Sequence, residues 1–406
     1  MKFYYRQVLV TILLLSTMGR AQAQDPTATA QKKGYQMKPN TKEIEANFLS
    51  SYYDQNGNNG AVTGGIGTEQ LTDIANVFIV NVPLDSVNSI GFYGGADFYS
   101  SASTDNIDNF SSSASSNDTR IFATVSYNRK NLSRGETYGI RAGFSNEYDY
   151  ASLSAGLSYT KEWNQGNSEI NITGQAFFDN WLIIYPYELR GDVSLPSGNR
   201  KSYNGQVNFS QVINKRLQMG VSAEFVKMTG LLSTPFHRVY FRDVTTPDIE
   251  RLPDHRLKIP IGLRLNYYPI DFLVLRSYYR YYWDDFGIIG NTVELETSFK
   301  LSTSLTVGPF YRYHNQSGAK YFAAYETHLS SEIFYTSDYD LSTFDSHKYG
   351  LTLRYSPLFG LLRAKKLPLT KRSFMLKYIE TRMGNYQRST QLDAYFISLN
   401  LGMSVK

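Results

Sequence analysis

The sequence predicts an all-β protein, an antiparallel meander closed into a transmembrane β-barrel of about sixteen strands. Three observations predict it. Apolar and polar side chains alternate along most of the chain with the period of two that marks a strand. The connections between these segments tend to alternate between long and short, as in outer-membrane barrels. Beyond the first 23 residues no run of about 18 apolar residues occurs, which excludes helical membrane spans.

The N-terminus has the pattern of a secretory signal. Lys2 and Arg6 precede the apolar stretch "VLVTILLLS", and "AQA" at 21–23 fits a cleavage site. The apolar stretch is shorter than the roughly 20 residues of a membrane anchor. We therefore expect a signal peptide over 1–23, a short periplasmic segment over 24–42 and a single barrel over 43–406. Export by such a signal predicts localisation in the outer membrane of a Gram-negative cell.

The strand pattern is clear in "RLKIPIGLRLNYY", where Ile259, Ile261 and Leu263 share one face and Lys258 and Arg264 share the other. The same reading along the chain predicts sixteen strands. They are expected near 43–53, 75–82, 89–99, 119–129, 137–145, 151–162, 168–178, 204–211, 216–227, 257–268, 271–283, 291–301, 304–314, 347–356, 372–382 and 391–402.

The connections predict which end of the barrel faces which compartment. Long connections at 54–74, 100–118, 179–203, 228–256 and 315–346 are expected outside the cell, and short turns such as 83–88, 269–270 and 302–303 in the periplasm. Termini on the periplasmic side require an even strand number, so sixteen fits, and fourteen fits if two weak strands are misread. A soluble sandwich or propeller would bury its apolar face and usually has shorter strands.

The stretch "RSYYRYYWDDFG" (276–287) mixes rings and charges, which a barrel wall accommodates on its two faces. Leu275, Tyr279, Tyr281 and Trp283 are expected to face lipid, with Trp283 in an aromatic girdle. The opposite face is polar and is expected to line the lumen. The charged candidates for the lumen are Arg264, Arg276, Arg280, Asp284, Arg312 and Arg354.

Composition limits the chemistry further. Cys is absent, so disulfides, thiolate metal sites and lipid attachment at Cys are excluded. The formal net charge is +5, and it falls to +2 without segment 1–23, which holds three cations and no acid. So small a surplus gives no indication of a nucleic-acid partner.

The long connections are rich in Ser and Asp. Carboxylates two or three residues apart suit Ca²⁺, which prefers oxygen ligands, although Asx and Ser turns explain the same composition without a metal. No cofactor other than Ca²⁺ is indicated. The candidate ligands are Asp105, Asp108, Asp338, Asp340 and Asp345.

The histidines give little indication of an enzyme. His237 and His255 lie in one long connection, where a shared metal site is one interpretation and plain polar surface groups the other. An outer-membrane hydrolase would need a Ser–His pair, for which His314 with Asn315 and the nearby Ser317 is the only adjacent candidate. We therefore predict that the protein is not an enzyme.

Several longer motifs resemble one family, the domain-of-unknown-function 3570 proteins of Gram-negative bacteria. These motifs include "NVPLDSVNSIGF", "STPFHRVYF", "KIPIGLRLNYY", "RSYYRYYWDDFGI" and "YTSDYDLSTFDS". The resemblance covers most of the chain and implies an outer-membrane β-barrel without an established activity. Members are often encoded beside a periplasmic flavin transferase and a thioredoxin-like protein, which suggests a redox-linked envelope system.

Two functions follow from these expectations. A barrel of this size with inward arginines suits a pore or gated port for a small solute or ion. The alternative is a scaffold or component of a multi-protein envelope complex, because motif-rich loops suit binding. The expected partners are outer-membrane lipid and, for the second function, other envelope proteins.

Overall fold

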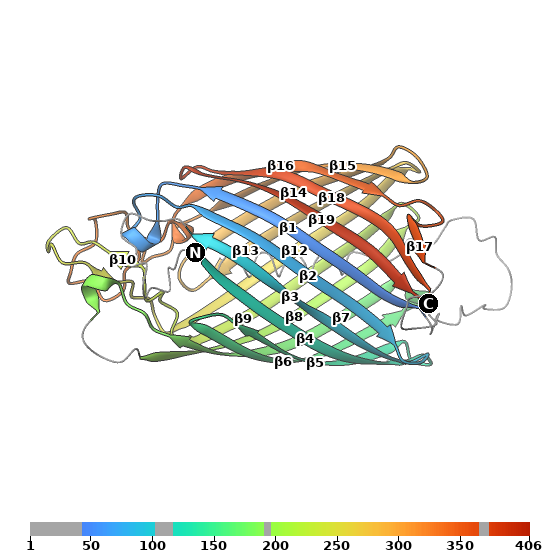
Figure 1. Ribbon diagram of the computed structural model, residues 1–406, viewed down its shortest axis with the longest axis horizontal. Helices are drawn as coiled ribbons and strands as arrows, with labels where there is room; N and C mark the ends of the chain where they lie inside the picture. The colour runs from blue at the N-terminus through green and yellow to red at the C-terminus, as the bar shows by residue number, and fades with distance from the viewer. Residues whose placement is uncertain (1–42, 102–116, 191–195, 365–372) are drawn as a thin grey trace.

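The computed structural model describes residues 43–101, 117–190, 196–364 and 373–406, and these form one closed antiparallel β-barrel (Figure 1). The predicted segments 1–23 and 24–42 lie outside the described residues. Sixteen strands make up the wall of the described barrel. They are β1 (Ile44–Asn56), β2 (Leu71–Pro83), β3 (Asn88–Ser101), β4 (Asn117–Asn131), β5 (Glu136–Asn146), β6 (Tyr150–Trp163), β7 (Ser168–Leu182), β8 (Ser197–Asn214), β9 (Leu217–Gly230), β12 (His255–Ile270), β13 (Leu273–Asp284), β14 (Ile289–Lys300), β15 (Leu305–Gln316), β16 (Phe344–Tyr355), β18 (Phe374–Arg388) and β19 (Leu392–Val405).

Each wall strand pairs with its neighbours in the chain, and β1 pairs with both β2 and β19. The pairing of Ile44 with Val405 and of Asn56 with Asp393 closes the sheet along the full length of β1. Closure leaves no open sheet edge, which is what a strand-built membrane protein requires. The predicted meander of sixteen strands is confirmed.

The connections also separate by length between the two ends of the barrel. One end carries 57–70, 183–196, 231–254 and 317–343, whereas the other carries turns such as 84–87, 215–216 and 271–272. We call these the long-loop end and the short-turn end, on the left and right of Figure 1. Smaller elements lie in the connections: β10 (Arg238–Val239), β11 (Asp248–Ile249), β17 (Leu362–Ala364), and the 3-10 turns η1 (Ala61–Thr63), η2 (Asn164–Gly166), η3 (Tyr187–Leu189) and η4 (Tyr339–Leu341).

No helix in the described part of the chain is long and apolar enough to span a membrane.

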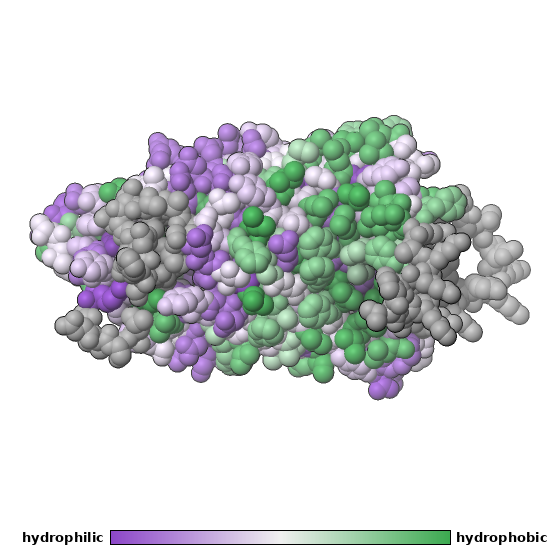
Figure 2. All heavy atoms as spheres, in the orientation of Figure 1, coloured by the Kyte–Doolittle hydropathy of each residue, from purple (hydrophilic) through white to green (hydrophobic). Residues whose placement is uncertain are grey.

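The outer face of the barrel is apolar over a belt. Successive outward positions of β5 and β6, such as Ile140, Phe144, Leu153 and Leu157, are half or more exposed and apolar, and their neighbours along each strand point inward. Figure 2 shows hydrophobic residues gathered over the half of the barrel nearer the short turns. A belt of exposed apolar side chains is stable only against lipid. The predicted transmembrane barrel is thereby confirmed.

The strands extend further toward the long-loop end than the sequence predicts. β8 begins at Ser197 instead of residue 204, β2 begins at Leu71 instead of 75, and β18 ends at Arg388 instead of 382. The outward side chains of these extensions include Asn199 and Lys201, which are polar and exposed. The wall therefore rises beyond the lipid, where neither face needs to be apolar and the alternation that predicts a strand disappears. In Figure 2 hydrophilic residues predominate toward the long-loop end, where these extensions and the long loops lie.

Candidate functional site: the charged lumen and its loop cap

The inner face of β9 to β18 carries a ladder of arginines and glutamates on facing strands. Arg276 lies directly opposite Glu296, Glu294 opposite Arg312, and Arg354 opposite Glu380. Like other directly opposed pairs in antiparallel sheets, they can interact because their Cβ atoms are close. N–O contacts join Arg276 to Glu296 (2.9 Å), Nε of Arg312 to Glu294 (2.6 Å), Arg354 to Glu380 (3.2 Å), Arg382 to Glu296 (2.8 Å) and Arg280 to Glu224 (3.9 Å).

Cations outnumber carboxylates along this ladder. Arg264 and Lys348 lie on the inner face, yet neither has a carboxylate within 4.0 Å among the described residues. Arg264 lies over the ring of Tyr278, and the Lys348 ammonium lies 4.1 Å from the centre of the Phe396 ring. Such cation–π contacts hold a cation in place without neutralising it. The ladder therefore presents a net positive surface to the lumen.

The structure places five predicted lumen residues in this ladder: Arg264, Arg276, Arg280, Arg312 and Arg354. The sixth, Asp284, lies at the rim. Lys348 and Arg382 were missed, although both share the inward register of their strands with Arg354 and Glu380. Their alternation with outward apolar residues is a signal that finds them.

The connections 231–254 and 317–343 pack on one another as a cap over the long-loop end, and 57–70 packs beside them. Within the cap, Val239, Phe241 and Tyr335 form one apolar cluster. A second cluster joins Phe286 and Ile288 of the β13–β14 connection to Ala319 and Leu341 of 317–343. Backbone hydrogen bonds between Arg251 and Tyr335 in both directions connect the two long loops. Apolar clusters and backbone pairing give the cap a fixed structure.

Buried polar contacts join this cap to the rim of the wall. Arg388, at the end of β18, donates to the Asp340 carboxylate in the loop 317–343 (2.5 Å). Gln316, at the end of β15, donates to the carbonyl oxygens of Asp340 (3.0 Å) and Ser342 (2.8 Å). These contacts hold the loop 317–343 across the mouth of the barrel, because separating it would leave buried charges unpaired.

Glu69 lies in the connection 57–70 and is only 2% exposed. The Gln55 side chain donates to its carboxylate (3.3 Å). Burial, reinforced by the nearby carboxylates of Asp340 and Asp338 and opposed by Arg388, raises the pKa of Glu69 to about 8. The carboxyl is therefore largely protonated in the folded protein at neutral pH.

This raised pKa predicts a pH-dependent stability. Below its ordinary pKa of 4.5, Glu69 is protonated in both the folded and the unfolded chain. Between that pH and about 8 only the folded protein keeps the proton, so this contribution to stability is lost as the pH rises. Glu69→Gln is expected to melt at a higher temperature than wild type at pH 8.5 and at a similar temperature at pH 4. Thermal unfolding in detergent across this range measures the difference, with Glu162→Gln, at a partly exposed carboxylate of β6, as control. An unchanged slope in Glu69→Gln would contradict the assignment.

The structure separates the predicted histidine candidates. His237 is buried in the cap, 2% exposed, whereas His255 is exposed at the start of β12 and contacts Asp254 (3.1 Å). His314 shares a hydrogen bond with Thr292 (2.8 Å), and the Ser317 hydroxyl donates to the carbonyl oxygen of Gly287 (3.2 Å). The interpretation of His314 and Ser317 as a hydrolase pair gains no support from these contacts.

The structure does not bring the predicted Ca²⁺ ligands together at one site. Asp105 and Asp108 lie outside the described residues. Asp345 accepts hydrogen bonds from Tyr313 and Asn315, and Asp340 pairs with Arg388. Asp338 instead approaches a histidine. A Ca²⁺ site built from these aspartates stays a prediction.

Two groups of three potential ligands lie within 4.8 Å among the described residues. One is Asp118, Glu147 and Asp149 at the rim, where the Tyr99 hydroxyl contacts both Asp118 and Glu147. The other is His237, Glu250 and Asp338 inside the cap. No local pattern indicates Glu250 as a ligand, because Asp338 lies in another connection and His237 is separated from it by a turn of the same loop.

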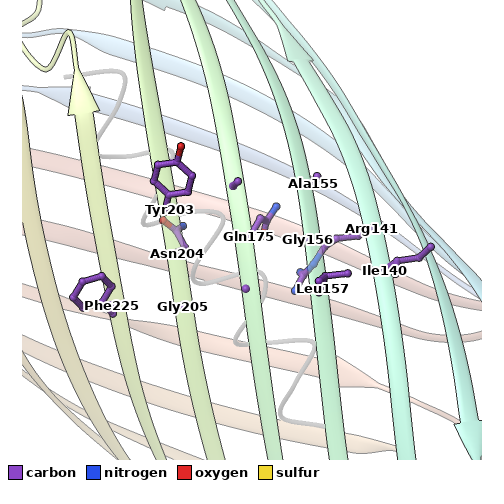
Figure 3. A pocket seen from close by; sticks show the side chains of 12 residues that line it. Ile140, Arg141, Ala155, Gly156, Leu157, Gln175, Tyr203, Asn204, Gly205 and Phe225 are labelled. Atoms are coloured by element: carbon purple, nitrogen blue, oxygen red, sulfur yellow. The ribbon is translucent and has the colours of Figure 1, made fainter.

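A depression of about 650 Å³ lies in the wall of β5 to β9 (Figure 3). Gly174 and Gly205 form its floor on the outer face, between the exposed side chains of Leu157 and Phe225. A Cβ at Gly174 would meet no atom within 4 Å. Since the outward residues around it are apolar, this depression suits lipid chains and adds no polar site.

Comparison with solved structures finds other outer-membrane proteins. The siderophore receptor PirA from Pseudomonas aeruginosa is 10% identical with a TM-score of 0.42, and the match covers 88% of this chain and 80% of PirA. The outer membrane protein OpdK from Pseudomonas aeruginosa is 7% identical with a TM-score of 0.38, covering 89% of this chain and 99% of OpdK. These are remote likenesses of barrel architecture alone. No curated protein matches the sequence.

A family model identifies the chain more specifically. The model described as "Protein of unknown function (DUF3570)" matches residues 96–360, which is more than half of the sequence. The matched region includes the arginine–glutamate strands β12 to β15 and both long loops of the cap. It confirms the resemblance seen in the motifs. The chain belongs to the DUF3570 family and is an outer-membrane β-barrel.

Proposed function

We propose that this protein is a gated port that passes a small anionic solute through the barrel, with the loop cap as its gate. The observation that carries the proposal is the positive inner face of β9 to β18 beneath the cap. Arg and Lys rings select anions in pores because they replace the hydration of a passing anion. A barrel of sixteen strands is wide enough to leave an aqueous channel.

The unpaired cations support an anionic solute in particular. Arg276, Arg312 and Arg354 are offset by facing glutamates, but Arg264 and Lys348 lack a carboxylate within 4.0 Å in the described part of the chain. Each lies against an aromatic ring instead, Arg264 against Tyr278 and Lys348 against Phe396. An anion can therefore bind without displacing an existing ion pair, and leave again as a mobile solute must.

The cap supports gating over a constantly open pore. Its apolar clusters and its contacts from Arg388 and Gln316 close 317–343 over the rim. A loop held by a limited number of contacts can open on the microsecond-to-millisecond scale or when a ligand stabilises the open form. Participation in a larger envelope complex, redox-linked or otherwise, stays a separate prediction that gentle solubilisation and pull-down would test.

Reversal potentials in planar bilayers test the proposal. Under a KCl gradient, openings of the purified full-length protein are expected to show a chloride-selective reversal potential. Arg264→Gln should shift that potential toward zero because it removes a lumen cation that has no facing carboxylate among the described residues. The control Lys201→Gln removes an exposed lysine of the outer face and should leave the potential unchanged. Cation-selective openings, or a folded barrel that never opens, would refute an anion port.

A further inference from the structure

A buried histidine in the cap lacks the contacts that buried histidines ordinarily have. His237 is 2% exposed, and neither of its ring nitrogens has a hydrogen-bond partner among the described residues. Its neighbour in the cap, His328, is equally buried, but its ring contacts Glu332 (2.6 Å) and the carbonyl oxygen of Thr336 (3.0 Å). Buried polar atoms are bonded in the great majority of cases, so the orphaned ring of His237 calls for an explanation.

Two buried carboxylates surround this ring. Nδ1 of His237 lies 3.7 Å from Oε1 of Glu250 and 3.9 Å from Oδ2 of Asp338. These distances are too long for a charge-assisted hydrogen bond, which is about 2.7–2.9 Å. Two ligands of a tetrahedral ion with bonds of about 2.1 Å lie roughly 3.4 Å apart. The two histidine–carboxylate distances exceed this by a few tenths of an ångström, and all three ligand atoms lie within 4.8 Å of one another.

Surrounding groups already hold both carboxylates in place. Glu250 accepts hydrogen bonds from the Thr336 hydroxyl (2.5 Å) and the Thr234 amide (2.6 Å). Oδ1 of Asp338 accepts from the amide of Asp340 (2.9 Å), which leaves Oδ2 as the oxygen nearer His237. Such outer contacts are characteristic of metal ligands, because they fix the orientation of each carboxylate.

The backbone fixes the histidine as well. The His237 amide donates to the carbonyl oxygen of Thr234 (3.0 Å), and the Glu250 amide donates to the carbonyl oxygen of His237 (2.9 Å). The β10–β11 pairing follows directly after His237 and brings Glu250 back beside it. The backbone therefore holds His237 and Glu250 side by side.

We propose that His237, Glu250 and Asp338 bind a divalent transition metal of the Zn²⁺ class inside the cap. One imidazole and two carboxylates suit Zn²⁺, Mn²⁺ or Fe²⁺, whereas Ca²⁺ takes six to eight oxygen ligands and disfavours an imidazole. A divalent ion would also balance the two buried negative charges. Three protein ligands leave a further position for water.

This site would join the two long loops of the cap. His237 and Glu250 come from 231–254, and Asp338 comes from 317–343. A bound ion would therefore cross-link the loops 231–254 and 317–343. The cross-link would lie between the Val239–Tyr335 cluster and the Asp340–Arg388 pair. The inference does not depend on the proposed transport function, because a metal ion could stabilise the closed cap of a barrel of any function.

Calorimetric titration with Zn²⁺ alone tests the site on the full-length protein, extracted in detergent and stripped with a chelator. Wild type is expected to bind one equivalent of Zn²⁺, and Ca²⁺ at the same concentration should not displace it. His237→Gln and Asp338→Asn should each weaken this binding by at least about tenfold, the lower end of what losing a metal-site contact costs. The matched control His255→Gln removes an exposed histidine at the start of β12, directly after the same connection, and should bind as wild type does.

Two further readouts keep the result interpretable. Heat-modifiable migration in gels establishes that each variant is a folded barrel. Zinc K-edge absorption on the wild type is expected to show a single imidazole among nitrogen and oxygen ligands at about 2.0–2.2 Å, and it needs no variant. A wild type that binds no Zn²⁺, folded His237→Gln and Asp338→Asn variants with unchanged affinity, or a zinc shell without imidazole would each overturn the proposal. The first of these outcomes would show that the cluster does not hold such a metal.

Discussion

Replacing residues 318–342 with a short glycine–serine linker is expected to turn the barrel into a constantly conducting pore. The segment contributes Ala319 and Leu341 to one cap cluster and Tyr335 to another, and it carries the Asp340 carboxylate that contacts Arg388. Without it, the remaining connections have little to pack against over the mouth. Each 1.4 kcal/mol lost from the closed state shifts the closed-to-open ratio about tenfold, so removing several such contacts should raise the open fraction by about a hundredfold or more.

Single-channel recording in planar bilayers measures this change. The control replaces Val244, Thr245 and Thr246, exposed residues at the tip of the other long loop, with glycine and serine. That variant should keep the closed state of wild type. A folded 318–342 deletion that carries no current would show that the cap is not what closes the lumen.

Asp284→Ala is expected to destabilise the folded protein by about 3–5 kcal/mol, the usual cost of leaving one partner of a buried ion pair alone. Asp284 is 1% exposed, and its carboxylate accepts hydrogen bonds from Arg256, the Tyr282 hydroxyl and the amide of Ile288. The alanine leaves the buried Arg256 guanidinium without this carboxylate, although its contacts with the Phe286 ring and the Tyr282 hydroxyl (3.5 Å) stay in place. The rim and the adjoining cap cluster are both expected to loosen.

Thermal unfolding in detergent, followed by circular dichroism, measures the loss. Lys130→Ala breaks a partly exposed ion pair with Glu162 at the short-turn end and should cost at most about 1 kcal/mol. The double variant Arg256→Met with Asp284→Leu should recover part of the stability, because it removes both buried charges together. Equal melting temperatures for Asp284→Ala and wild type would show that the pair contributes nothing to the fold.

The fold was predictable because a barrel wall obeys a local rule. Along β12, Ile261 and Leu263 face outward and Arg264 faces inward, and this can be read from the alternation alone. Each of the sixteen strands gave this signal wherever lipid touches the wall. The signal failed at the start of β8, where Asn199 and Lys201 face water and polarity no longer distinguishes the two faces.

The inward position of the ladder residues could be predicted from the sequence, but their partners could not. The inward register of Arg276 follows from its own strand, but its partner Glu296 was identified only by the pairing of β13 with β14. The contact of Arg382 with Glu296 spans 86 residues of sequence and depends on the curvature of the closed barrel. No local pattern contains that information.

By itself the sequence predicted about sixteen strands, which face of each strand points outward, and the difference in connection length between the two ends of the barrel. The faces could be predicted because a period of two relates every side chain to its nearest neighbours along the strand. Only the tertiary structure decided that the long loops fold into a cap, that Asp284 and Asp340 serve as buried anchors, and that His237 meets Asp338 about a hundred residues away. Loops have no period, so their contacts depend on which strands the closed barrel places side by side and how the loops then pack.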